Sequence, residues 1–276
     1  MALAPAPLVT GPTRQPNPYG LFSVLSFPPA GADQKWQNGI RWETTGCEAA
    51  SGVGDPNCAP DSTTGVPRGF ADGSGVSDAS PFYVYGSRVC TPVGTSPEDL
   101  TGKALGNLIA REEERVEQAL WTGDLGSRNY PDEAVNVLPG ALASTPQTIS
   151  FAVAALEGWL ADNYGSLGVL HMPRFTAQLG VDAGALTAKG SGLFTNLGTP
   201  VVAGTGYTHS TAEATYGQAT LYATPPLFGY RTDPLLFGNG ANLFDSSSND
   251  LRAMAERGYV IGWDECDAVG KILTKP

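Results

Sequence analysis

The stretch that decides the fold is residues 96–123, SPEDLTGKALGNLIAREEERVEQALWTG, the longest segment of the chain that can form one helix. The hydroxyl of Ser96 can cap the first turn, and Pro97 fits the first helical position, where the backbone N–H is not needed. Two acidic residues follow at the positive end of the helix dipole, and Gly123 can end the helix. At about 1.5 Å per residue, the segment predicts a rod of roughly 35–40 Å.

An apolar stripe along this helix is interrupted by the charged block Arg111, Glu112, Glu113, Glu114 and Arg115. A helix inside a globular core rarely tolerates such a block. The block therefore predicts either a helix that is anchored at both ends and crosses open surface, or a helix whose middle meets another subunit. A solvated face with stabilising pairs three and four residues apart is the alternative. The stripe itself consists of Leu100, Ala104, Leu105, Leu108, Ile109, Val116, Ala119 and Leu120.

The composition is poor in charge and rich in glycine and proline. Of the 276 residues, 16% are charged, 35 are Gly and 22 are Pro, whereas about 25% of residues are charged in ordinary soluble domains. The centres of protein interfaces are depleted in charge. The composition thus favours a subunit whose surface is largely covered by protein contacts, with compositional drift towards Ala and Gly as the alternative.

The net charge of −11 provides no basic surface for direct binding of nucleic acid. No run approaches the roughly 18 apolar residues of a membrane span. Residues 1–30 have neither a charged n-region nor an apolar h-region, so we expect no secretion signal, no membrane association and synthesis in the cytoplasm.

The order of elements predicts five regions. Repeated proline in the first region forbids a helix and favours an extended arm. The compact fourth region holds only five charges between residues 141 and 210, so we expect neighbours to cover much of it. The regions are an N-terminal arm (1–32), a long β-hairpin (33–92), the long helix with a connector (93–140), helices packed on a sheet (141–225) and a closing segment (226–276).

Within these regions the periodicity predicts further elements. The hairpin strands are expected at WQNGIRWETTGCEAA and SPFYVYGSRVC, around a long irregular tip. In the closing segment we expect a short helix, LRAMAER, followed by strands. The compact region is expected to contain a buried helix (145–164), a buried strand (167–172), a short helix (173–179) and a strand with a turn (198–207).

Metal and disulfide chemistry find little support. The four cysteines are too scattered for a zinc site, and free thiols are expected, although Cys47 and Cys58 could pair in an oxidising environment. Four aspartates loosely resemble calcium ligands but lack the spacing of a calcium loop, so a solvated acidic loop is favoured. These aspartates are Asp55, Asp61, Asp72 and Asp78.

Catalytic chemistry is also poorly supported, because no nucleophile elbow, phosphate-binding loop or metalloprotease motif is found. His171 ends an apolar strand and is expected to be a hydrogen-bonded structural residue rather than a base. Gly204-Thr205-Gly206 is expected to be a tight turn. The run Glu112–Glu114 could supply paired carboxylates for glycoside hydrolysis, but neighbours on one helix point in different directions. We therefore expect no enzyme, no catalytic or metal site and no cofactor.

The order of elements and several local motifs resemble the major capsid protein of tailed phages, the Hong Kong ninety-seven fold shared with encapsulin shells. Residues 110–123, AREEERVEQALWTG, loosely match that family's ARxEExAxxxG run on its long "spine" helix. Pro173, Leu179 and the run Pro200-Val201-Val202 look like the family's NP-x-x-x-x-x-L helix and L-x-G-x-PVV strand. LRAMAERGYVIGWDECDAVGKIL echoes the closing R…R-x-x-x-V…AF-x-x-L pattern.

The resemblance implies an α+β capsid fold with an extended N-terminal arm, a long E-loop hairpin, a P domain built on the spine helix and a compact α/β A domain. It implies a virion protein that assembles with itself into hexamers and pentamers and meets portal, scaffold or decoration proteins. It also implies that double-stranded DNA is enclosed without specific binding, and it suggests glycine hinges at Gly39 and Gly86 for shell expansion. Contacts between subunits are expected at the charged block 111–115 and at Trp36, Trp42, Phe82 and Tyr83.

Three alternatives remain open. An encapsulin-type compartment would use the same fold to enclose a protein cargo. Another phage structural protein, such as a tail-tube or adhesin β-domain, would consist mostly of strands and lack the long helix. A hydrolase that uses a carboxylate pair would need a deep pocket with two close acids.

Overall fold

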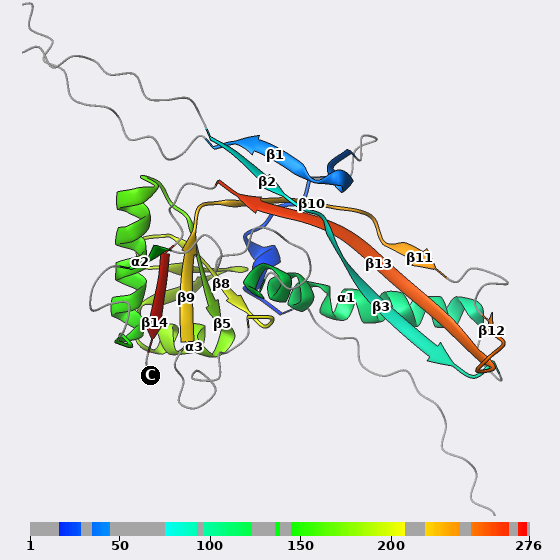
Figure 1. Cartoon of the computed structure of the whole chain (residues 1–276). Helices are drawn as coiled ribbons and strands as arrows, with labels where there is room; N and C mark the ends of the chain where they lie inside the picture. Colours follow the sequence, from blue (N-terminus) through cyan, green and yellow to red (C-terminus); the bar gives the residue numbers. More distant parts are fainter. Residues whose placement is uncertain are drawn as a thin grey trace, which may run out of the picture.

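The long helix α1 (Pro97–Thr122) lies along two long strands and ends beside a compact sheet (Figure 1). The computed structural model describes residues 17–28, 35–44, 75–92, 96–122, 136–138, 145–207, 219–237, 244–264 and 270–274. The predicted helix is confirmed at its start, where the backbone N–H of Asp99 donates to the Ser96 hydroxyl at 3.1 Å. Most of the predicted stripe is buried, but Ile109 is largely exposed.

The two long strands are β3 (Phe82–Cys90) and β13 (Asp250–Trp263), which pair antiparallel from Phe82↔Tyr259 to Cys90↔Leu251. On its other edge β13 pairs with three short strands in turn. Alternate residues of β3 face α1, and the two backbones approach closely at Gly86, where an added Cβ would lie 2.5 Å from the Leu108 nitrogen. The short strands are β10 (Leu227–Arg231), β11 (Leu235–Phe237) and β12 (Phe244–Asp245).

Two sequence expectations are wrong in this part. The segment LRAMAER belongs to strand β13, where Ala253 and Ala255 are buried while Met254 between them is partly exposed. Pairing on both edges overrides its helical propensity. Among the described residues, the segment SPFYVYGSRVC forms β3, which pairs with β13, whereas the strand that contains Trp42 pairs with the segment Val76–Ala79.

A shorter ribbon occupies the region of the predicted hairpin. Strand β1 (Ile40–Glu43) pairs antiparallel with β2 (Val76–Ala79), from Ile40↔Ala79 to Glu43↔Val76. The connecting residues, with Cys47, Cys58 and three of the four aspartates, lie outside the described residues. A long hairpin tip and the hinges at Gly39 and Gly86 thus stay predictions, although Gly86 already has a packing role.

The compact part is a seven-stranded sheet in the order β4-β14-β9-β5-β8-β7-β6. Helix α2 (Ile149–Asn163) packs on β14 and β9, and helix α3 (Arg174–Asp182) packs on β6 and β8. The helices and strands predicted between residues 145 and 207 are thereby confirmed. The strands are β4 (Asn136–Val137), β14 (Gly270–Thr274), β9 (Ala219–Thr224), β5 (Val169–Pro173), β8 (Pro200–Gly204), β7 (Gly192–Thr195) and β6 (Leu186–Lys189).

The architecture is α+β, as predicted, with one hydrophobic cluster in each part. The first joins α1, β3 and β13 and includes Leu21 and Leu25 of the arm. The second lies between the compact sheet and its helices. Strand β14 comes from the closing region yet sits inside the compact sheet, and the five-region division itself stays a prediction.

Candidate functional site

The middle of α1 carries a carboxylate that links the helix to β13. Glu112 is buried, and one Arg257 nitrogen donates to its two oxygens at 2.8 and 2.6 Å. The Tyr259 hydroxyl donates to the same carboxylate at 2.9 Å. Because Glu112 is buried and accepts hydrogen bonds from residues of β13, the expectation that the whole block crosses open surface is wrong for this residue.

One turn further on, Glu117 joins three segments of the chain. Its side chain is fully buried. One oxygen accepts the backbone N–H of Leu21 at 3.0 Å. The other accepts the N–H groups of Thr205 and Gly206 at 2.7 and 2.8 Å, and the Thr205 hydroxyl at 3.3 Å. Glu117 therefore ties the arm and the turn after β8 to the long helix.

Glu113 lies beside Glu117 and also holds the arm. One of its oxygens accepts the backbone N–H of Phe22 at 2.8 Å. Burial raises the pKa of Glu117 to about 7, against the partly offsetting effect of the hydrogen bonds from Gly206 and Leu21. Burial also raises the pKa of Glu113, and the Phe22 hydrogen bond opposes this. Glu117 is thus poised to take up a proton near neutral pH, and Glu113 holds its proton to a higher pH than an ordinary glutamate does.

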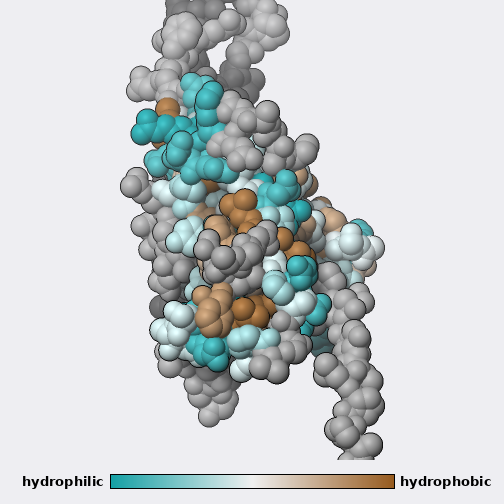
Figure 2. All heavy atoms as spheres, turned by 90° about the vertical axis from the view of Figure 1, so that its right-hand side faces the viewer, coloured by the Kyte–Doolittle hydropathy of each residue, from teal (hydrophilic) through white to brown (hydrophobic). Residues whose placement is uncertain are grey.

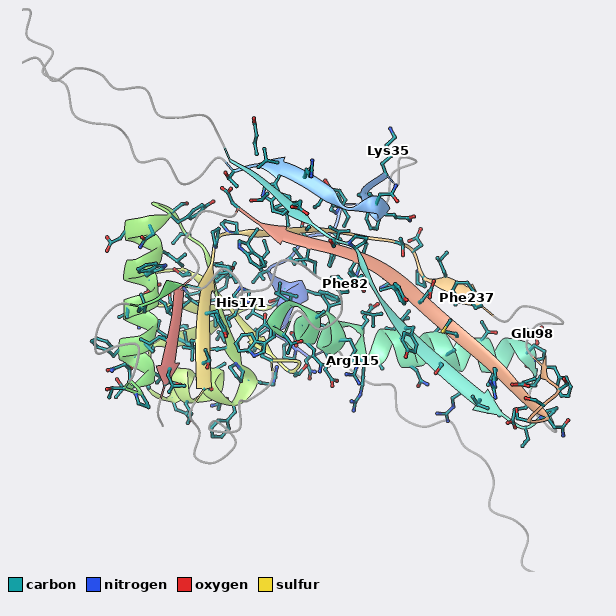
Figure 3. The ribbon with its side chains drawn as sticks, in the orientation of Figure 1. Lys35, Phe82, Glu98, Arg115, His171 and Phe237 are labelled. Atoms are coloured by element: carbon teal, nitrogen blue, oxygen red, sulfur yellow. The ribbon has the colours of Figure 1, made fainter. Side chains whose placement is uncertain are left out.

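His171 is a structural residue, as predicted. It is fully buried in β5, and its ring nitrogens lie 2.8 Å from the Tyr207 hydroxyl and 2.9 Å from the Thr224 hydroxyl. Burial lowers its pKa to about 3, so the ring is neutral at physiological pH. Figure 3 places His171 in the compact sheet near the end of α1.

The other charged residues of the block lie on the exposed side of α1. Arg111 pairs with Glu114 at 3.3 Å, and Arg115 donates to Gln118 at 2.6 Å. Figure 3 shows Arg115 pointing away from the long strands. A subunit contact through Arg111, Glu114 and Arg115 stays a prediction, whereas Glu112 and Glu113 are engaged within the chain.

The four predicted aromatic contact residues have different environments. Phe82 is buried and stacks on Tyr259, with ring centroids 5.8 Å apart, so it is a core residue of the chain. Trp42 packs edge-on against Phe228 at 4.9 Å, and Trp36 stacks on Tyr230 at 5.8 Å. Tyr83 is 67% exposed. Of the four, Tyr83 is the one that the described part of the chain leaves mostly open.

Tyr83 belongs to an apolar face on the side of the long strands that faces away from α1, which we call the outer sheet face. The register sets Tyr85 beside Glu256 and Leu235, and Ser87 beside Met254 and Phe237. Tyr83 and Tyr85 are more than 60% exposed, and Leu235 and Phe237 more than 40%. Figure 3 shows Phe237 on β11. Figure 2, in which the right-hand side of Figure 1 faces the viewer, shows apolar patches among polar residues. Sequence reasoning anticipated only Tyr83 of this face.

Sequence reasoning also missed Glu117 and its partners Leu21, Thr205 and Gly206. Helical geometry turns Glu117 about 100° from Val116 and about 160° from Ala119, so Glu117 lies off the predicted apolar stripe. The stripe therefore carries no signal for the burial of Glu117.

Two chemical arrangements considered from the sequence can be checked in the described part of the chain. This part contains no group of three or more His, Cys, Asp or Glu residues placed to hold a metal ion. Glu112 and Glu114 face different partners and do not form a carboxylate pair. None of the described helices is both long and apolar enough to cross a membrane.

Comparison with known proteins gives no family model and no curated relative that matches the chain. Solved structures match over nearly the full length. The Phage G gp27 major capsid protein structure has a TM-score of 0.56 and 10% identity over 97% of this chain and 94% of that one. The capsid of a native GTA particle has 0.56 and 12% over 99% and 96%. The SrpI encapsulin of Synechococcus elongatus has 0.54 and 10% over 96% and 91%. The chain therefore has the tailed-phage capsid fold that encapsulins share.

Proposed function

We propose that this chain is a major capsid protein, which assembles with copies of itself into the icosahedral head shell that encloses a phage genome. The observation that carries the proposal is the likeness to shell-forming proteins, which extends over 97% or more of the chain for the Phage G and GTA structures. A likeness that included only one part of the chain would fit many functions. One that includes the long helix, the outer sheet and the compact sheet supports a shell subunit.

The surface of the chain supports assembly. The outer sheet face exposes Tyr83, Tyr85 and Phe237, and large apolar side chains grouped on one face mark sites of protein contact. Tyrosine and phenylalanine are also the side chains enriched at interface centres. Contacts with neighbouring copies in hexamers and pentamers would bury this face together with Trp36 and the exposed side of α1.

The charge of the chain fits an enclosing wall. With a net charge of −11, the chain repels DNA phosphates, so a packaged double-stranded genome would be held by confinement rather than by binding. We place the protein in the virion after synthesis in the host cytoplasm, in contact with portal and scaffold or decoration proteins and without a catalytic role.

The second candidate is an encapsulin-type compartment that encloses protein cargo. It is favoured by the match to the SrpI encapsulin, whose TM-score of 0.54 is close to those of the phage structures. Both candidates use the same fold, and they differ in what the shell encloses, which is DNA in a capsid and protein in a compartment.

Electron microscopy of the purified protein, with light scattering of the same sample, tests the proposal. Uniform icosahedral particles or capsomer rings are expected, and dispersed monomers at high concentration would contradict it. Nuclease-protected double-stranded DNA in particles from the native source would distinguish a capsid from a compartment, whose particles would hold protein instead.

A further inference from the structure

Glu113 and Glu117 meet the N-terminal arm at a junction within one chain. We propose that these two carboxylates form a proton-dependent latch, which holds the arm around residues 20–22 against α1 more tightly as the pH falls. The proposal concerns contacts within one chain, so it does not rest on the proposed function.

The geometry places the arm directly over both carboxylates. A Cβ added at Gly20 would contact an oxygen of Glu113 and lie 3.0 Å from an oxygen of Glu117. The next two backbone N–H groups, of Leu21 and Phe22, donate to these same two oxygens. Leu21 is fully buried. Because the arm covers the pair, lifting the arm would return both carboxylates to water.

The arm and the turn after β8 both donate hydrogen bonds to the two carboxylates. Among the described residues, no Lys, Arg or His side chain donates a hydrogen bond to Glu117. The turn after β8 contributes three hydrogen bonds, through Thr205 and Gly206. Arg174 of α3 acts on Glu113 through its charge alone, and its guanidinium donates to the Pro18 carbonyl of the arm at 2.8 Å. The buried negative charge is therefore held mainly by backbone dipoles.

Other ionisable groups lie near the pair. Burial lowers the pKa of His171 to about 3 and raises that of Tyr207 well above its usual value, so both are neutral. Glu112 is paired with Arg257, and Tyr259 beside it has its pKa raised by burial. Arg231 lies over the Phe22 and Phe27 rings. Burial gives Glu117 a pKa of about 7, close to neutral pH, and it raises the pKa of Glu113 in the same direction.

The sign of the effect follows from linkage. With the arm bound, the pKa of Glu117 is raised from 4.5 to about 7 because of burial. With the arm lifted, hydration lowers this pKa, while the bonds from Thr205 and Gly206 remain and lower it further. The bound state takes up protons more readily, so binding of the arm is strongest below about pH 5 and weakens as the pH rises through 7. Repulsion between the two ionised glutamates acts in the same direction.

Hydrogen exchange of the full-length protein tests the latch. Protection factors, which are corrected for the intrinsic pH dependence of exchange, are compared for the arm peptide 17–28 between about pH 6 and pH 8.5. A folded pKa of about 7 predicts a fall in arm protection of up to about tenfold over this interval. Peptides from β5, in the buried compact sheet, should change much less.

Three variants sharpen the test. In Glu117→Gln the side chain cannot titrate, so arm protection should lose most of its pH dependence, and Glu113→Gln should lose part of it. The matched control is Glu114→Gln on the exposed side of the same helix, which should behave like the parent. Unchanged arm protection across the pH range, or an equal fall in Glu117→Gln, overturns the latch. Should Glu117→Gln fail to fold, the parent series and Glu113→Gln decide the matter.

Discussion

Replacing Glu112 with alanine should destabilise the chain by about 3–5 kcal/mol, because the substitution leaves a buried guanidinium without its counter-charge. The side chains of Arg257 and Glu112 are 12% and 10% exposed, so water cannot replace the lost carboxylate fully. Among the described residues, no group accepts a hydrogen bond from the Nε of Arg257. Removing Glu112 also takes the acceptor from the Tyr259 hydroxyl, which adds about 1 kcal/mol.

The double variant Glu112→Leu with Arg257→Leu separates charge burial from packing. Both charges leave together, and two leucines of moderate size fill part of the space, so the loss should be well below that of Glu112→Ala. The exposed control Glu114→Ala removes a surface pair with Arg111 and should cost no more than about 0.5 kcal/mol.

Urea unfolding followed by circular dichroism measures these differences. The protein is kept dilute, and its dispersed state is verified by sedimentation, because assembly would add apparent stability. A loss below about 1 kcal/mol for Glu112→Ala, or an equal loss in the double variant, would refute the reasoning that the buried pair joins α1 to β13.

Three further outcomes are expected. Gly86→Ala should destabilise the chain by about 1–3 kcal/mol in urea, because the new Cβ meets the α1 backbone 2.5 Å away and neither backbone can move freely. His171→Gln should flatten the dependence of stability on pH between about pH 6.5 and pH 3. The parent folds with a neutral His171 ring, whose pKa is lowered to about 3 by burial. The stability of the parent therefore falls by up to about 1.4 kcal/mol for each pH unit by which the pH drops in this range. Tyr83→Asp should reduce particle yield in electron microscopy while leaving the urea midpoint of dispersed subunits unchanged. Tyr83→Phe, which keeps the ring, should assemble normally. A lower urea midpoint for Tyr83→Asp would mean that Tyr83 supports the fold instead.

The long helix could be predicted because its signals are local. Ser96 and Pro97 mark its start, and the stripe of apolar residues marks its buried side. Helix α2 and strands β5 and β8 of the compact part were also readable, since β5 is a short apolar run and helix α2 has clear periodicity. Local patterning and tertiary structure agree in these segments.

The first half of strand β13 could not be predicted because its partners decide its structure, whereas the strand predicted at GYVIGW is confirmed as its second half. The letters LRAMAER favour a helix locally, yet β3 on one edge and three short strands on the other supply hydrogen bonds along the strand. Phe82 was misassigned for a related reason. Its alternation with Tyr83 was visible, but the sequence did not say which of the two faces would meet α1.

The charged block shows why a run of acids cannot be interpreted as one surface. Successive residues of a helix are turned by about 100°, so Glu112, Glu113 and Glu114 point in three directions. Glu112 meets Arg257, Glu113 meets the arm and Glu114 meets Arg111 at the surface. Glu117 lies about 40° from Glu113 around the helix and therefore joins it at the arm.

Because these contacts come from one helix, α1 fixes the arm, the long strands and the turn after β8 relative to each other. The helix is neither a purely apolar core helix nor an exposed rod. A change in the protonation of Glu113 and Glu117 would act at the point where the arm and the compact part meet α1, whereas a change at Glu112 would act on β13 alone. The two sets of variants should therefore have different effects. Variants at 113 and 117 should change how arm protection depends on pH, and variants at 112 should lower the global stability of the chain at every pH.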